Sequence, residues 1–195
     1  MYNFEEIAND DEIKKLILRT NPTYSNSLEL EVDAGLSPIF DDFSIESYSF
    51  CFKNRNNEEN WISLTMYTDE DLSDVLGFLC DLIKTKCPIC TLIQNEGEHG
   101  IFYARPINDN QIHFVVADDY ELYRNFCTNN VHYSFEDAHI CLDIVIDKKQ
   151  LIKQFYDELW EKTQSYKDAK FDNLWKDIQK RYINLFDKLK EYLSL

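Results

Sequence analysis

The chain has 195 residues, of which 44% are hydrophobic and 14% aromatic, so it has enough apolar surface to form a core and global disorder is excluded. Its formal net charge of −16 disfavours binding to nucleic acid or to an anionic membrane and favours a basic partner, although an acidic surface also serves solubility alone. No apolar run approaches the ~20 residues of a membrane-spanning helix. The acidic start of the chain does not fit a signal peptide, so we expect a cytoplasmic protein with reduced cysteines.

The charge is distributed unevenly along what we expect to be one α+β domain over residues 1–195. Residues 1–147 contain 28 acidic and nine basic residues, a charge of −19. Residues 148–195 contain eight acidic and 11 basic residues, a charge of +3. The sequence therefore predicts an acidic sheet-containing body followed by C-terminal helices.

The first part of the body combines one helix with three strands. Apolar residues recur at helical spacing over residues 4–19, which predicts a short amphipathic helix. Residues 27–33 predict a strand. Apolar residues alternate with small polar ones over residues 44–53, and residues 61–67 return after a polar turn, so these two segments predict a β-hairpin.

The clearest helix is predicted over residues 69–86. Thr68 is a suitable N-cap, and Pro88 prevents the helix from continuing. Its apolar face consists of Leu72, Val75, Leu76, Leu79, Leu82 and Ile83. This spacing is typical of a helix that packs one side on a core.

Four further strands are predicted over residues 89–95, 100–106, 111–117 and 139–146. Short polar segments with Asn, Asp or Gly separate the first three, which is typical of antiparallel neighbours. The predicted fold class is therefore α+β, with an antiparallel meander sheet packed by helices on one face and a C-terminal helical hairpin.

Two amphipathic patterns predict the C-terminal hairpin. Asp147 can cap the first helix, whose apolar stripe includes Leu151 and Phe155. The second helix is predicted over residues 169–193, and polar residues indicate a break near residues 164–168. The pattern leaves open whether these helices pack on the body or on a partner.

Cys87 and Cys90 form a CxxC motif. In a thioredoxin-type pair the helix N-terminus lowers the thiol pKa. Here the motif ends a helix and begins a strand, so we expect no redox function. Zinc would need two further ligands, and no second CxxC or HxxxH spacing occurs. We therefore expect no metal and no cofactor, and six reduced cysteines that act as small core residues.

Acid–base groups occur together at Glu96, Glu98 and His99. Polar residues beside Gly97 and Gly100 are also ordinary in a hairpin turn. No phosphate-binding loop, serine-hydrolase motif or zinc-protease motif occurs in the chain. We therefore predict no catalytic residues and a protein that is not an enzyme. An enzyme with a dispersed active site stays open as an alternative.

Two acidic clusters with an aromatic neighbour are the candidate partner-binding residues: Asp41, Asp42, Asp118, Asp119, Tyr120 and Glu121. Their carboxylates would present anionic groups to a basic partner much as phosphates do. Each cluster alone is also typical of a solvated loop.

The closing strand and the helix after it carry a family resemblance. They read Cys141-Leu142-Asp143-Ile144-Val145-Ile146-Asp147-Lys148-Lys149-Gln150-Leu151-Ile152-Lys153-Gln154-Phe155-Tyr156-Asp157-Glu158-Leu159 and follow a hairpin–helix–meander outline. In outline and composition the chain resembles immunity proteins encoded beside bacterial polymorphic or contact-dependent toxins. That resemblance implies a small, acidic, cytoplasmic toxin inhibitor. The basic C-terminal segment departs from the uniformly acidic pattern.

The leading hypothesis is an immunity protein that binds a basic toxin or nuclease domain and blocks it by steric and electrostatic occlusion. One alternative is a phage- or plasmid-borne acidic inhibitor that mimics nucleic acid and blocks a nucleic-acid enzyme. The other is the enzyme with a dispersed active site. The oligomeric state stays open.

Overall fold

The computed structural model describes residues 23–24, 28–39, 42–53, 59–65, 71–86, 88–95, 98–118, 139–165 and 173–195. These residues form two β-sheets and three helices, so the predicted α+β class is confirmed. The predicted helix over residues 4–19, the Thr68 cap and Cys87 lie outside the described residues.

Three strands form an antiparallel sheet in the order β2-β3-β4: β2 (Leu30–Ile39), β3 (Asp42–Lys53) and β4 (Glu59–Thr65). The predicted hairpin is confirmed, because β3 pairs with β4 in a register that places Phe50 opposite Ile62. The strand predicted over residues 27–33 continues to Ile39. The register of β2 with β3 shifts between Gly35 and Leu36, and glycine is common at such irregularities. Pro38 lies near the end of an edge strand, where proline is tolerated.

The second sheet has five strands in the order β1-β8-β7-β6-β5. They are β1 (Thr23–Tyr24), β5 (Ile89–Asn95), β6 (Glu98–Pro106), β7 (Gln111–Asp118) and β8 (His139–Asp147). The predicted meander is confirmed from β5 to β8, where each strand is antiparallel to the next. The short β1 pairs parallel to β8. The separation of β2, β3 and β4 into their own sheet was not predicted.

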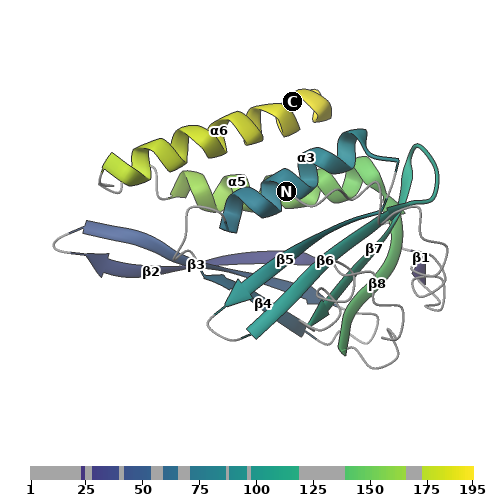
Figure 1. Cartoon of the computed structure of the whole chain (residues 1–195), viewed down its shortest axis with the longest axis horizontal. Helices are drawn as coiled ribbons and strands as arrows, with labels where there is room; N and C mark the ends of the chain where they lie inside the picture. Colours follow the sequence, from purple (N-terminus) through teal and green to yellow (C-terminus); the bar gives the residue numbers. More distant parts are fainter. Residues whose placement is uncertain are drawn as a thin grey trace.

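Three helices lie together on one side of the two sheets (Figure 1). They are α3 (Asp71–Lys84), α5 (Lys148–Ser165) and α6 (Asn173–Leu193). The predicted cap of α5 is confirmed, because a carboxylate oxygen of Asp147 accepts a hydrogen bond from the Gln150 N–H at 3.0 Å. An N-cap of this kind satisfies one of the backbone donors left unpaired at a helix start.

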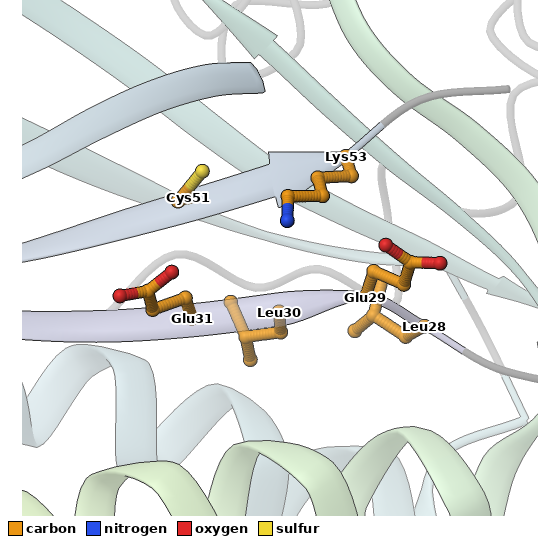
Figure 2. Close-up of a pocket in the computed structure, with 6 residues that line it drawn as sticks. All are labelled: Leu28, Glu29, Leu30, Glu31, Cys51 and Lys53. Atoms are coloured by element: carbon orange, nitrogen blue, oxygen red, sulfur yellow. The ribbon is translucent and has the colours of Figure 1, made fainter. Parts of the chain in front are cut away.

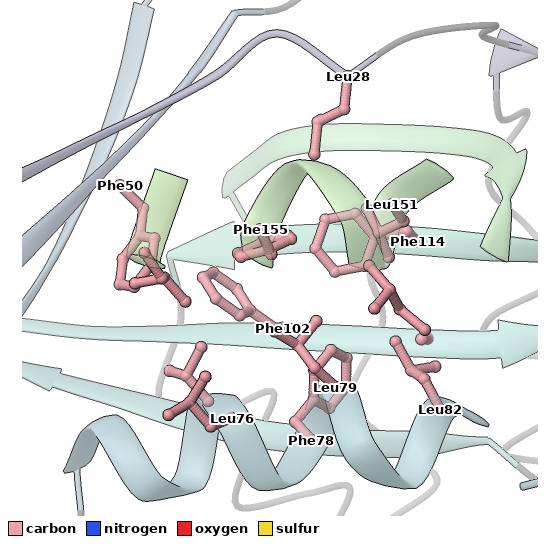
Figure 3. Packing of buried hydrophobic residues seen from close by; sticks show 14 of the residues in the cluster. Leu28, Phe50, Leu76, Phe78, Leu79, Leu82, Phe102, Phe114, Leu151 and Phe155 are labelled. Atoms are coloured by element: carbon pink, nitrogen blue, oxygen red, sulfur yellow. The ribbon is translucent and has the colours of Figure 1, made fainter. Parts of the chain in front are cut away.

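Phenylalanine rings from both sheets and two helices meet in the core (Figure 3). Phe155 of α5 is fully buried, and its ring centroid lies 5.6 Å from Phe102 and 6.1 Å from Phe50. On α6, Phe186 is buried with its ring centroid 5.1 Å from that of Trp160 on α5, and the carbonyl oxygen of Leu185 lies 3.7 Å from Sγ of Cys80 on α3. The described parts of both C-terminal helices therefore pack on the body, which answers the question that their sequence patterns left open.

Candidate functional site

Charged side chains alternate with core residues along the start of the three-stranded sheet. Leu28 and Val32 are buried, whereas Glu29, Glu31 and Asp33 are exposed. Successive side chains of an extended chain point to opposite sides. Since Val32 belongs to the core, the three carboxylates lie on the opposite side of the strand from it, and the helices lie together on one side of the two sheets (Figure 1).

The strand register extends this charged surface across β3 and β4. Glu31 is opposite Cys51, and Cys51 is opposite Trp61, whose side chain is 50% exposed. Directly opposed residues of an antiparallel pair point to the same face of a sheet. We call the resulting surface the acidic face, and it consists of Glu29, Glu31, Asp33, Cys51, Lys53, Glu59 and Trp61.

Lys53 is the basic residue of the acidic face. Its Nζ lies 3.8 Å from Oε1 of Glu59, and its backbone N–H donates to the carbonyl oxygen of Glu29 at 3.2 Å. Figure 2 shows its amine between the carboxylates of Glu29 and Glu31. Lys162 of α5 lies 3.7 Å from a carboxylate oxygen of Asp33, so two ammonium groups stand against four carboxylates and the formal charge of the acidic face stays negative.

A pocket of about 260 Å³ opens between β2 and β3 at this surface. It is lined by Leu28, Glu29, Leu30, Glu31, Cys51 and Lys53 (Figure 2). Burial raises the pKa of the Cys51 thiol, the charges of Glu59 and Glu31 raise it further, and Lys53 lowers it. Because the thiolate is the nucleophilic form, this cysteine is not activated for covalent chemistry. The pocket suits recognition of a cation better than catalysis.

Helix α5 covers the start of the β2 edge. The side-chain oxygens of Gln154 and Glu158 accept hydrogen bonds from the backbone N–H groups of Leu28, at 3.0 Å, and Val32, at 3.5 Å. Lys162 of the same helix lies 3.7 Å from a carboxylate oxygen of Asp33. An open edge would invite another strand to pair with it. These contacts occupy the start of the β2 edge, so a further strand cannot pair there.

A second group of polar residues lies on the five-stranded sheet, on the side opposite the phenylalanine core. Nε2 of His113 and Oδ1 of Asp143 are 2.6 Å apart, and Arg105 is opposite His113 in the register of β6 and β7. A general base has to reach its substrate. The side chain of His113 is 1% exposed, so its pair with Asp143 has the geometry of a structural interaction.

The structure describes two of the six predicted partner-binding residues. Asp118 ends β7 and is exposed, whereas Asp42 begins β3, and its side chain is outside the description. The two residues belong to different sheets. Asp41, Asp119, Tyr120 and Glu121 lie outside the described residues, so their predicted role stays a prediction.

The described part of the CxxC motif is Cys90, which is buried at the start of β5. Cys51, Cys80 and Cys141 are also described, and they form no disulfide bond among the described residues. Among the described residues, no group of three or more His, Cys, Asp or Glu side chains could hold a metal ion. Of the turn predicted around Glu96, only the β6 residues after it are described, and their first two side chains are not.

Sequence reasoning missed the acidic face. The alternation of Glu29, Glu31 and Asp33 with apolar residues was a local signal for one charged side of a strand. Trp61 gave no such signal, because it begins an apolar strand and looks like a core residue. Only the pairing of three strands shows that it shares a surface with Glu31.

No protein-family model, no curated protein and no solved structure matches the chain. In the parts of the chain that the structure describes, the helices are too short or too polar to span a membrane.

Proposed function

We propose that the protein is a cytoplasmic immunity protein, which binds a basic toxin domain through the acidic face and blocks it by steric and electrostatic occlusion. The acidic face carries the argument. It is a sheet surface with four carboxylates, one lysine (Lys53) and a half-exposed tryptophan, and Lys162 of α5 reaches its edge at Asp33. Aromatic anchors within a charged rim are typical of protein interfaces.

The charge of the whole chain supports the same partner chemistry. A net charge of −16 attracts a basic protein from a distance and speeds its association. The sequence resemblance to immunity proteins agrees with this proposal. The thiols of Cys51, Cys90 and Cys141 are buried, and the side chain of His113 is 1% exposed. These four groups are poorly placed to reach a substrate, which favours binding over catalysis.

A row of carboxylates favours the nucleic-acid mimic as a second candidate. Glu29, Glu31 and Asp33 follow one side of β2 at intervals of roughly 6.5 Å, twice the rise per strand residue. A regular anionic row resembles a phosphate backbone, so a nuclease or another nucleic-acid enzyme is the partner on this reading. Both candidates bind through the acidic face. The mimic would cover the nucleic-acid site of its partner, whereas the immunity protein could cover another part of the toxin.

Affinity capture from the native host tests the proposal. Three baits are compared, and the first is the wild type. The acidic-face variant carries Glu29→Gln, Glu31→Gln and Glu59→Gln. The control variant neutralises three other exposed acids through Asp109→Asn, Asp187→Asn and Glu191→Gln. Both variants move the formal net charge from −16 to −13. We expect a basic toxin domain to be retained by the wild type and control, inhibited by both, and lost from the acidic-face variant.

The proposal fails if the two variants retain the same proteins in the same amounts, or if the captured protein keeps full activity when bound. If the captured protein is inhibited and nucleic acid competes with the inhibitor for it, the mimic is favoured. If nucleic acid does not compete, occlusion elsewhere on the toxin is favoured.

A further inference from the structure

Trp61 is a large apolar residue that the core leaves half exposed. A single exposed apolar side chain is ordinary on a protein surface. The surroundings of this one are unusual, because Glu59 precedes it by two residues on the same side of β4 and Glu31 lies two strands away in the same row. An aromatic ring attracts a cation to its face, and carboxylates on two sides add to that attraction.

The spacing of these groups fits one guest side chain. Neighbouring strands are about 4.8 Å apart, so Glu31 and Trp61 are separated by roughly 10 Å at their Cα atoms. Cys51 lies between them, and its small side chain is only 2% exposed. Glu59 is about 6.7 Å along β4. A flat cation placed on the indole therefore lies within reach of both carboxylates.

Lys53 occupies part of this site in the free protein. Its ammonium group lies 3.8 Å from Glu59, with exposed fractions of 36% and 53% for the two side chains. Exposed pairs of this kind are weak. A cation that also stacks on Trp61 can therefore displace Lys53 from Glu59.

We infer that the acidic face recognises an arginine side chain of its protein partner, with the guanidinium stacked on Trp61 and hydrogen-bonded to Glu59 and Glu31 in place of Lys53. Arginine fits better than lysine. Its planar guanidinium stacks on aromatic rings and forms paired hydrogen bonds with carboxylates, whereas the lysine ammonium is a compact, strongly hydrated charge. This inference rests on the proposed function and names the chemistry of the partner residue.

Binding of blocked hexa-arginine and hexa-lysine peptides to the full chain tests the inference. The indole N–H resonance of Trp61 is followed by NMR and assigned with a Trp61→Phe variant. We expect the resonance to shift on titration and hexa-arginine to bind about two- to fivefold more tightly than hexa-lysine, as expected for an exposed cation–π contact. In Trp61→Ala, we expect the two peptides to bind equally.

Removal of Lys53 provides a gain-of-binding test. In Lys53→Gln, we expect both peptides to bind more tightly than in the wild type, because Glu59 loses its own cation. The control is Lys149→Gln, which removes an exposed lysine from α5 with the same change in net charge. A structural role for Lys53 would leave the two variants alike, and that result contradicts the inference.

The outcomes separate this inference from the proposed function. No peptide binding, equal binding of both peptides to the wild type, or an unchanged arginine preference in Trp61→Ala overturns the arginine site. If the peptides bind equally, or if the arginine preference is unchanged in Trp61→Ala, the variant Glu29→Gln, Glu31→Gln, Glu59→Gln decides about the surface. Weaker binding of both peptides to that variant keeps the acidic face as a docking surface. Unchanged binding to that triple variant removes support from both.

Discussion

Cys141 shows how burial controls reactivity at the scale of one residue. Its side chain is buried in β8, and burial raises the pKa of the thiol from 9.0 to about 11, with a further increase from the charge of Asp118. A hydrogen bond with the Asp118 backbone opposes the increase. Since only the thiolate reacts readily, iodoacetamide should not label Cys141 in the native protein at pH 8.

The same pKa shift predicts a loss of stability at high pH. The folded state favours the protonated thiol, so the contribution of Cys141 is fully present below pH 9 and is lost as the pH rises toward 11. Peptide mapping by mass spectrometry after alkylation measures the first prediction, and chemical denaturation of the wild type and Cys141→Ala between pH 8 and 11 measures the second. Rapid native labelling at pH 8 would contradict this description of the residue.

The pair of His113 and Asp143 predicts a contrast between a buried and an exposed interaction. Replacing Asp143 with Ala should lower the free energy of unfolding by about 1.5–3 kcal/mol, the range for hydrogen bonds to charged groups. The control is Asp157→Ala, which removes the exposed partner of Lys153 and should cost about 0–1 kcal/mol. Urea denaturation measures both, and equal costs would show that burial of His113 adds nothing.

At the scale of elements, the two sheets come into close contact at Gly100. A Cβ atom at this position of β6 would lie 2.7 Å from Cγ2 of Ile62 in β4, closer than unstrained contact allows. Gly100→Ala should therefore destabilise the protein by about 1–3 kcal/mol. In an Ile62→Ala background the added methyl group has room, so its cost should fall. A double-mutant cycle measures the coupling, and additive costs would show that the sheets do not touch here.

Helix α5 belongs to the folded body, and its removal should prevent folding. Leu151, Phe155 and Leu159 are fully buried. Phe155→Ala alone should cost about 3–5 kcal/mol, whereas Ile183→Ala, on an exposed position of α6, should stay near ±0.5 kcal/mol. Because a domain's total stability is only about 5–15 kcal/mol, a fragment of residues 1–147 should not melt cooperatively. A soluble fragment with a cooperative transition would make the helices a separate appendage.

Local patterns determined most element positions. The alternation in β7 and β8 and the apolar stripe of α5 depend on neighbouring residues, and the structure places these elements within a residue or two of the prediction. The division into two sheets depends instead on pairings between distant segments, such as β1 with β8. No local pattern records such a pairing.

The candidate site was harder to predict than the fold for the same reason. The predicted clusters were groups of residues adjacent in sequence, such as Asp118 to Glu121. The acidic face takes its residues from three strands, and Trp61 joins Glu31 only through the register of β3. A surface of this kind is defined by strand pairing, which composition and spacing do not contain.

At the scale of the whole molecule, the central claim is that an acidic sheet face captures a basic partner. Salt screens the attraction between an acidic surface and a basic partner, since the Debye length falls from about 30 Å at 0.01 M salt to about 10 Å at 0.1 M. A comparison at these two concentrations therefore tests whether the charge of the acidic face steers association. Electrostatic steering acts on the association rate and weakens as salt rises.

The most direct measurement is the association rate of the captured partner by stopped flow at these two salt concentrations. It compares the wild type with the acidic-face variant Glu29→Gln, Glu31→Gln, Glu59→Gln and with the control variant Asp109→Asn, Asp187→Asn, Glu191→Gln. Added salt should lower the association rate of all three proteins. At low salt, the acidic-face variant should associate several-fold more slowly than the control variant of equal net charge. Equal rates for the two variants at low salt would contradict a binding role for the acidic face.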